Sequence, residues 1–284
     1  VSVALIAAAS AFAFRAAHRT ADPVAPSGTV ETSAGAPSAP ARPHVPAPPV
    51  PVAAAEELAS SFAELAQSVS AVVGMAIRPV GDNAVAATYG SWTSGPAWST
   101  SKVPLVLAAL HEQAEPSVTG DMEAAITRSD NAAAEQIWAT LGDPVTAASK
   151  VDQVLREEGD QTVVQSQRIR PEFTAFGQTL WSLADQVLFL SHAACDPRTA
   201  PVLELMNRIE NDQQWGLGSI PSAQFKGGWG PSVEGRYLVR QFGLVPTPTG
   251  TIAVALAAEP GSGSFSDGVQ ALDVLTDWVT THIA

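Results

Sequence analysis

Two groups of strand-like segments at opposite ends of the sequence constrain the fold more than any other feature. Runs of this kind lie at 71–78 and 84–92 near the start, and at 223–227, 237–245 and 251–257 near the end. Their short length, their apolar residues and the turn residues around them are typical of strands. Because helical patterns fill the chain between the two groups, we predict an α+β fold with one sheet formed from both ends. A helical lobe is then inserted between the two groups of strands.

The helices are predicted from apolar residues that recur every three or four positions. The clearest case closes the chain, where Val269, Leu272, Leu275, Val279 and Ile283 share one face. A helix is also predicted to begin near residue 99. Further helices are predicted over 56–69, 121–127, 132–141, 143–158, 179–195, 201–210 and 264–283, with a loop at 161–177.

The first 55 residues differ in composition from the rest of the chain. Residues 1–14 carry no charge and are mostly apolar, which is typical of a signal sequence or a short membrane anchor. Residues 21–55 are rich in Pro, Ala, Ser and Thr, a composition typical of an extended, flexible linker. We therefore divide the chain into a signal-like or anchoring segment at 1–20, a linker at 21–55 and a globular domain at 56–284. This order predicts an extracytoplasmic protein that is secreted or anchored to the cell membrane.

Charge and cysteine content exclude several classes of function. The net charge of −13 argues against nucleic acid as a partner, because proteins that bind it present clustered Lys and Arg. The single cysteine, Cys195, allows no internal disulfide and no zinc site built from several thiolates, and we interpret it as a small buried residue. The five histidines are scattered without a ligand spacing, so we expect no metal and no cofactor. We expect a monomer.

A candidate nucleophile lies in the segment 98–104, Trp-Ser-Thr-Ser-Lys-Val-Pro, which precedes an apolar run. Proline is tolerated mainly in the first turn of a helix, so Pro104 places a helix start close to Ser99. Lys102 then lies one turn after Ser99, with its amine on the same face as the hydroxyl. This arrangement suits a serine nucleophile with a lysine beside it, near backbone amides that stabilise negative charge. The alternative is a helix-capping serine followed by a surface lysine.

Two further motifs follow Ser99-x-x-Lys102: Ser-Asp-Asn at 129–131 and Lys-Gly-Gly at 226–228. In order, spacing and context, the three resemble the S-x-x-K, S-D-N and K-T-G signatures of the penicillin-recognising serine enzymes, which include class A β-lactamases and D,D-peptidases. The first two motifs match literally, and the resemblance covers about residues 56–284. It implies a β-lactamase/transpeptidase-like fold with an antiparallel sheet, flanking helices and an inserted, reduced helical lobe. The alternative for Ser-Asp-Asn alone is a simple helix cap.

The resemblance implies a role for each of five polar residues. Ser99 would attack an acyl carbon and form a covalent acyl-enzyme, while Lys102 would take its proton or tune the local field. Ser129 would relay a proton to the leaving nitrogen, and Asn131 would hold a substrate amide. Lys226 would attract a substrate carboxylate and bias Ser129. These assignments describe an acyl-transfer site.

The resemblance also implies an oxyanion hole and a strand that binds substrate. The backbone amides of Ser99 and Trp229 would form the oxyanion hole, with Gly228 beside Trp229 on the binding strand. Arg236 or Arg240 would supply the positive partner of a substrate carboxylate. For at least one of these two arginines, an exposed position on a strand is the expected alternative.

Three departures from the family pattern bear on activity. Gly227 stands where the third motif has Thr or Ser, so one hydrogen bond to a substrate carboxylate is lost. The chain between Lys102 and Ser129 is shorter than in class A enzymes, which implies a trimmed lobe. No E-x-x-x-N sequence precedes Thr179, where the resemblance predicts a deacylating glutamate. The acidic residue nearest to that position is Glu172, and the glutamates Glu157 and Glu158 are more distant.

These features predict an exported serine hydrolase or acyltransferase that acts through a Ser99 acyl-enzyme on an amide or ester. Its substrate is expected to be a small molecule or a peptidoglycan-like compound of the cell wall. Two alternatives stay open: a β-lactamase in which Glu172 is the deacylating base, and a catalytically weak cell-envelope binding protein that retains the fold. A triad hydrolase is disfavoured because no G-x-S-x-G sequence occurs.

Overall fold

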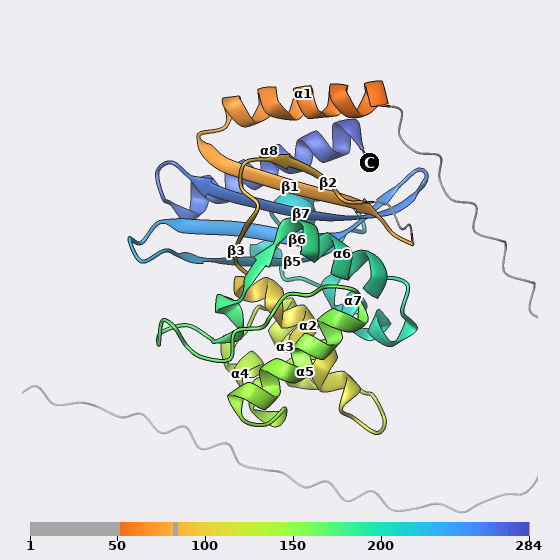
Figure 1. Cartoon of the computed structure of the whole chain (residues 1–284), viewed down its shortest axis with the longest axis vertical. Coiled ribbons are helices and arrows are strands. Elements are labelled where there is room, and N and C mark those ends of the chain that lie inside the picture. The colour runs from red at the N-terminus through yellow and green to blue at the C-terminus, as the bar shows by residue number, and fades with distance from the viewer. Residues whose placement is uncertain (1–51, 82–84, 284) are drawn as a thin grey trace, which may run out of the picture. The chain divides into compact units, whose positions relative to one another are not determined.

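The computed structural model describes residues 52–81 and 85–283, and Figure 1 shows their arrangement. The strands of the main sheet are β1 (Ala71–Pro79), β2 (Ala87–Gly90), β5 (Gln224–Pro231), β6 (Tyr237–Thr247) and β7 (Gly250–Pro260). They form an antiparallel sheet in the order β2-β1-β7-β6-β5. Because β1 pairs with β7 along its whole length, the predicted sheet built from both ends of the domain is confirmed.

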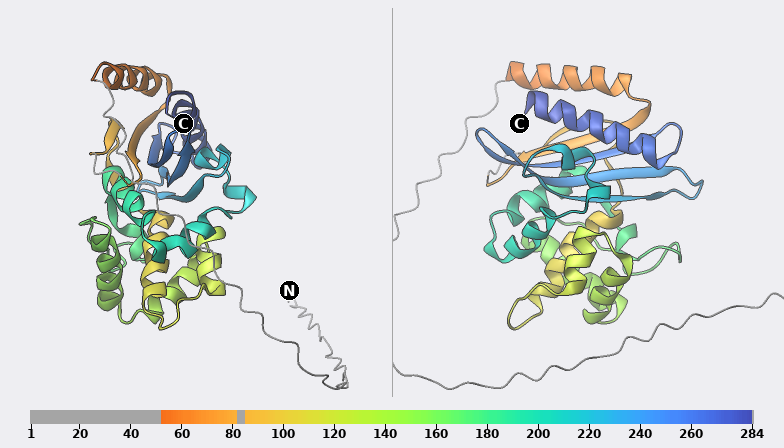
Figure 2. Two further views of the ribbon diagram at one scale, coloured as in Figure 1. Left: turned by 90° about the vertical axis from the view of Figure 1, so that its right-hand side faces the viewer. Right: turned by 180° about the vertical axis from the view of Figure 1, so that it is seen from behind.

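Helices cover both faces of the sheet, as the two views of Figure 2 show. On one face lie α1 (Val52–Ser68) and α8 (Phe265–His282), which also contact each other through the rings of Phe62 and Trp278. On the other face, α6 (Leu183–Ala193) packs against β1 and β7. The inserted lobe lies beyond this second face and consists of α2 (Lys102–His111), α3 (Gly120–Thr127), α4 (Asn131–Thr140), α5 (Pro144–Glu157) and α7 (Ala200–Met206).

The central helix of the lobe is α2, which is buried over residues 103–110. Its sequence, Val-Pro-Leu-Val-Leu-Ala-Ala-Leu, is apolar on all sides, and a helix of this kind is stable only inside a core. It packs against α3, α4 and α5. A short 3₁₀ turn, η1 (Trp98–Ser101), precedes α2 and contacts β5, so Ser99 lies where the lobe meets the edge strand of the sheet.

The helix predicted over 179–195 is wrong in its first part. Residues Leu180–Ser182 form a strand, β4, that pairs with β3 (Ser94–Pro96) in a separate two-stranded sheet. The helix α6 begins only at Leu183, where the Ser182 hydroxyl caps it by accepting the backbone N–H of Asp185 at 3.0 Å. A short apolar run does not by itself distinguish strand from helix, which is why the sequence pattern missed the change.

Two other expectations need correction. The first helix begins at Val52, not at residue 56, so the end of the segment predicted as a linker is helical. Cys195 was predicted to be buried, but it is exposed, because it lies in the loop that follows the last turn of α6. The segment predicted at 1–20 and the linker up to residue 51 lie outside the described residues. Within residues 52–81 and 85–283, no helix is both long and apolar enough to span a bilayer.

Candidate functional site

The candidate nucleophile lies on a strained turn at the start of α2. Ser99 is half-buried in η1, and the residue before it, Trp98, has a φ angle of 49°. This left-handed conformation is unfavourable for a bulky residue, and such strain tends to occur at functional sites. The Ser101 hydroxyl stabilises the turn by donating to the Trp98 carbonyl at 2.7 Å. The predicted helix start near Ser99 is thus realised as a 3₁₀ turn that leads into the α-helix.

The amine of Lys102 joins the first motif to the second. Its Nζ donates to the Ser129 carbonyl at 2.5 Å and to Asn131 Oδ1 at 2.7 Å, and it lies 3.4 Å from Ser129 Oγ. Within the described part of the chain, the Ser99 hydroxyl makes no hydrogen bond, so the sequence-based pairing of this hydroxyl with Lys102 is not formed. Lys102 therefore reaches across the site from α2 to the beginning of α4.

The amine of Lys226 joins the third motif to the second. Its Nζ donates to Ser129 Oγ and to the Gly227 carbonyl, both at 2.9 Å. Ser129 itself has a φ of 57°, which turns the backbone so that its hydroxyl lies within reach of both lysines. The next residue, Asp130, caps α4 by accepting the backbone N–H groups of Ala132 and Ala133. Three segments far apart in the sequence thus meet at one hydroxyl group.

Burial sets the charge of the two lysines. Desolvation lowers the pKa of Lys102 to about 7, although the negative charge of Asp130 opposes the shift. Desolvation also lowers the pKa of Lys226 well below its ordinary value, and the charge of Lys102 lowers it further. No carboxylate in the described residues forms an ion pair with either amine. Lys102 is therefore able to act as a proton acceptor near neutral pH.

Gly228 allows the edge strand β5 to touch the backbone before α2. A Cβ atom at this position would lie only 2.9 Å from both the Ala97 carbonyl oxygen and the Ser99 amide nitrogen. Only glycine permits so close an approach of two backbones. Trp229 is the next residue of β5, so its amide lies one residue beyond the contact with Ser99. The residues predicted to form the oxyanion hole therefore belong to two segments in direct contact.

Replacing Gly228 with alanine is expected to reduce covalent labelling of Ser99 at least tenfold. The added methyl group meets backbone atoms that must shift, at a cost of about 1–3 kcal/mol in unfolding free energy. Labelling rates measured by intact mass, together with thermal unfolding, check this expectation. Gly120→Ala is the matched control, because nothing lies within 4 Å of its Cβ position. Equal labelling of the two variants would show that the contact does not shape the site.

The two arginines considered as carboxylate partners lie outside this cluster. Arg240 is fully buried, and its guanidinium donates to the carbonyls of Gly95, Pro96 and Trp181 and to Gln186 Oε1. Arg236 is exposed, and it donates to the carbonyls of Pro260 and Gly261 at the end of β7, at 3.1 Å each. Neither guanidinium hydrogen-bonds to Ser99, Ser129 or either lysine. Arg240 is thus a buried structural residue, because its side chain points to the sheet face that packs on β3 and β4.

The acids considered as deacylating bases are also engaged elsewhere. Glu172 is exposed and pairs with Arg170 at 3.1 Å, and Glu157 pairs with Arg198 at 3.2 Å. Glu158 is buried at the end of α5, where desolvation raises its pKa. No hydrogen bond or ion pair joins any of these three carboxylates to the Ser129 cluster within the described residues. The structure therefore gives no base for a deacylating water among them.

Glu135, which belongs to none of the three sequence motifs, lies one helical turn after Asn131 on α4. Its carboxylate pairs with Arg168 at 2.8 Å. This ion pair connects the loop at 161–177 to α4 of the helical lobe. Glu135 and Asn131 are four residues apart on one helix face, and this spacing could have identified Glu135 as a neighbour of the site.

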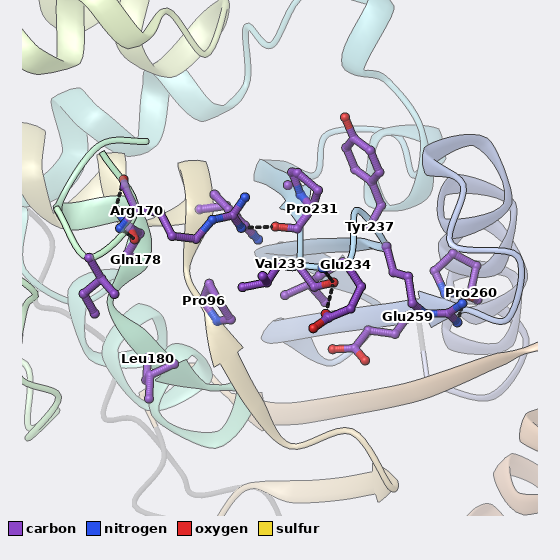
Figure 3. A pocket seen from close by; sticks show the side chains of 16 residues that line it. Pro96, Arg170, Gln178, Leu180, Pro231, Val233, Glu234, Tyr237, Glu259 and Pro260 are labelled. Carbon is purple, nitrogen blue, oxygen red and sulfur yellow. Dashed lines mark hydrogen bonds between the residues drawn. The ribbon is translucent and has the colours of Figure 1, made fainter. Parts of the chain in front are cut away.

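A pocket of about 480 Å³ adjoins the nucleophile turn through Trp98 (Figure 3). It lies between the loop at 161–177, the strand β4 and the turn that joins β5 to β6. Three of its lining residues, Ile169, Leu180 and Val233, are aliphatic side chains with 69–83% of their surface exposed. Arg170 crosses from the loop to the Pro231 carbonyl at its rim. Exposed apolar side chains that converge on a pocket are typical of ligand-binding surfaces.

The described residues contain no group of three or more His, Cys, Asp or Glu side chains arranged to hold a metal ion.

Comparisons with known proteins place the fold. No protein-family model and no curated protein matches the chain. Among solved structures, a class A β-lactamase from Bacteroides cellulosilyticus is 15% identical, with a TM-score of 0.66, and covers 81% of this chain and 98% of its own. The TLA-3 extended-spectrum β-lactamase is 14% identical, with a TM-score of 0.62, over 79% and 99%. An ancestral class A β-lactamase is 18% identical, with a TM-score of 0.61, over the same shares. The domain thus has a class A β-lactamase-like fold, as the sequence motifs predicted.

Proposed function

We propose that this chain is an extracytoplasmic serine hydrolase or acyltransferase that forms a covalent acyl-enzyme at Ser99 with a peptidoglycan-like amide or ester. The observation that carries the proposal is the bridge of Ser129 Oγ between the amines of Lys102 and Lys226. This bridge links all three motifs beside a serine that lies on a strained turn. The apolar start of the sequence and the proline-rich segment after it support export.

Ser99 and Lys102 would carry out the first half of the reaction. The neutral amine of Lys102 accepts the hydroxyl proton as Ser99 Oγ bonds to the acyl carbon of the substrate. For this, Nζ turns from the Ser129 carbonyl toward Ser99, a rearrangement of the kind that bound substrate induces in active sites. The amides of Ser99 and Trp229 stabilise the negative charge that develops on the acyl oxygen.

Ser129 would complete the transfer. As the bond between the acyl carbon and the leaving atom breaks, the Ser129 hydroxyl donates its proton to that atom. Ser129 regains a proton from the Lys102 ammonium, to which it is close, so Lys102 returns to its neutral form. One proton has then passed from Ser99 to the leaving group through two side chains. The acyl group stays on Ser99.

Release of the acyl group is expected to be slow. Hydrolysis needs a base for the attacking water. Glu157 and Glu172 form ion pairs with arginines, and Glu158 is buried at the end of α5, so none of the three bonds to the Ser129 cluster. An acyl acceptor that is a better nucleophile than water, such as a neutral amine, would depend less on a base. The proposal therefore favours a long-lived acyl-enzyme over rapid β-lactam hydrolysis.

Two other functions compete with this proposal. A catalytically weak cell-envelope binding protein is favoured by Gly227, which removes the hydroxyl group of the third motif. A β-lactamase that uses Glu172 requires this carboxylate to leave Arg170 and approach Ser99. The lifetime of an adduct on Ser99 separates all three functions.

Incubation of the protein with a fluorescent penicillin and, separately, with a fluorophosphonate tests the proposal. Intact mass is expected to show an adduct with at least one of the two probes on the wild-type chain that persists for many minutes, and none on Ser99→Ala. An exposed serine elsewhere, changed in Ser68→Ala, serves as the control and is expected to label normally. Turnover of penicillin without accumulation of an adduct supports the β-lactamase. No reaction with either probe supports the binding protein and refutes the enzyme.

A further inference from the structure

Two indole rings border the side-chain position of Gly227 closely. A Cβ atom there would lie 3.2–3.3 Å from ring atoms of Trp215 and 3.6 Å from a ring atom of Trp229. Gly227 and Trp229 are two residues apart on β5, so they face the same side of the strand. The missing hydroxyl of the third motif is therefore not replaced by open space. An aromatic surface lies directly against the place where a hydroxyl-bearing side chain would stand.

Buried polar groups hold Trp215 in this place. Gln241, the cross-strand neighbour of Gly227, donates to the Trp215 carbonyl at 2.7 Å and accepts the backbone N–H of Leu217 at 2.8 Å. Between them, Gly216 donates its N–H to Asp273 at 2.6 Å. Gln241 is fully buried, and together with Asp273 it holds the backbone of residues 215–217 in place from two sides. Trp215 is thus part of the scaffold and does not depend on its own N–H, which has no partner in the described residues.

Three aromatic rings form a continuous, half-buried wall beside the edge strand. The ring centroids of Trp215 and Trp229 are 5.9 Å apart, and Phe265 lies 5.4 Å from Trp229 and 6.1 Å from Trp215. These distances and the tilted or edge-on angles are typical of stable aromatic packing. A wall of this kind offers apolar surface and the negative faces of its rings, which disfavour an anion.

The cations around the site do not compensate for the lost hydroxyl. Lys102 and Lys226 are buried and point to Ser129, so both amines are already hydrogen-bonded. Arg240 lies in the core, and Arg236 bonds to backbone carbonyls at the end of β7. A free carboxylate on the leaving side of a substrate would therefore meet an aromatic surface instead of a hydroxyl group and an arginine.

We propose that Trp215 determines the specificity of the site, by selecting acyl donors whose leaving group carries an uncharged apolar or aromatic substituent in place of a carboxylate. This inference rests on the proposed acyl-enzyme at Ser99 and names the class of substrate that forms it. Gly227 then has a positive role, because it makes room for the indole ring.

The test uses three thioesters with the same N-acylated amino acid as the acyl part. Their leaving groups are thioglycolate, its uncharged methyl ester and benzyl mercaptan. Thiol release and intact mass of the full chain give the rate constant for acylation by each probe. The wild-type protein is expected to react at least tenfold faster with the benzyl mercaptan probe than with the thioglycolate probe, and the methyl ester is expected to lie between them.

Three variants test whether this preference depends on Trp215. Trp215→Phe retains a ring and loses no hydrogen bond, so it is expected to keep the preference. Gly227→Thr places a side chain against the indole and is expected to slow all three probes. The double variant Trp215→Ala with Gly227→Thr restores the hydroxyl and removes the ring, so its preference is expected to shift at least tenfold toward thioglycolate.

Labelling with a fluorophosphonate distinguishes failure of the Trp215 proposal from failure of the proposed function. If the fluorophosphonate labels Ser99 while the wild-type chain prefers thioglycolate, or while the double variant keeps the wild-type ratio, the role of Trp215 is refuted and the proposed function stands. If Ser99 reacts with neither the fluorophosphonate nor a thioester, both proposals fail. Fluorophosphonate labelling of each variant also shows whether its site is intact, so a misfolded variant is recognised and Trp215→Phe then decides the result.

Discussion

Replacement of Lys102 with methionine is expected to slow formation of the Ser99 adduct by about two to four orders of magnitude, the range typical of a lost general base. Methionine fills a similar volume but cannot accept a proton. Burial makes the charged form of Lys102 unfavourable in the folded protein, so the same change is expected to raise the free energy of unfolding at neutral pH. A variant that is more stable and less reactive excludes misfolding as the cause.

The same lysine predicts the pH dependence of acylation. With its pKa lowered to about 7, Lys102 is charged below that pH and neutral above it. The labelling rate of the wild-type protein is therefore expected to rise between about pH 6 and pH 8 and then level off. The rate of fluorophosphonate labelling, measured at a series of pH values over this range, checks this expectation. A rate that is flat, or that falls as pH rises, would contradict the role of Lys102 as the base.

Stability is linked to the same titration. The pKa of Lys102 is lower in the folded protein than its ordinary value of 10.5, so the unfolded chain binds more protons between about pH 7 and 10.5. Stability is therefore expected to increase with pH in that window, and Lys102→Met is expected to remove part of the increase. Lys150→Met is the matched control, since this lysine pairs with Glu112 on the surface. It is expected to leave labelling and its pH dependence unchanged.

The parts of the site that could be predicted from sequence are those defined by short-range spacing. Pro104 located the helix start, and the order of residues identified Ser99 and Lys102 as one motif, although the Lys102 amine bonds to Ser129 and Asn131 and not to Ser99. Ser129, Asn131 and Lys226 belong to motifs in which residue type and order carry the information. Each of these features depends on one turn of helix or one strand, so tertiary packing does not change its meaning.

The parts that could not be predicted depend on contacts between distant segments. Trp215 lies in a loop whose sequence gives no sign that Gln241 holds it against Gly227. Nothing local to Lys102 indicates that its amine bonds to the second motif instead of to Ser99. The exposed Cys195 follows from the end of α6, a boundary that an apolar pattern sets only within a few residues.

Arg240 illustrates the same limit, because the identity of a strand residue does not show which face of the sheet it occupies. Arg240 is paired across the strands with Gly228, which faces the backbone of Ala97 and Ser99. Its guanidinium therefore points to the inner face, where it also lies over the Trp92 ring at 5.1 Å. Burial lowers its pKa to about 9, so it stays charged at neutral pH. Its charge is balanced by carbonyl oxygens and an amide oxygen instead of a carboxylate.

Replacement of Arg240 with alanine is expected to lower the free energy of unfolding by about 3 kcal/mol. The change leaves buried carbonyl groups of Gly95, Pro96 and Trp181 without their donor, and it opens a cavity. For a domain of this size, the loss corresponds to a decrease of roughly 6–12 °C in the melting temperature. Calorimetry of the purified protein measures both quantities.

The same variant separates a structural role from a substrate-binding role. Gly95 and Pro96 lead directly into η1, so their release is expected to displace Ser99 and to slow labelling by the fluorophosphonate, which has no carboxylate. A carboxylate partner would behave differently, because its loss would weaken only carboxylated substrates and leave stability unchanged. Arg236→Ala is the matched control: its guanidinium is exposed and bonds only to carbonyls at the end of β7, so small changes in both quantities are expected. If Arg240→Ala proved as stable as Arg236→Ala, the buried hydrogen bonds of Arg240 would not be what positions the nucleophile turn.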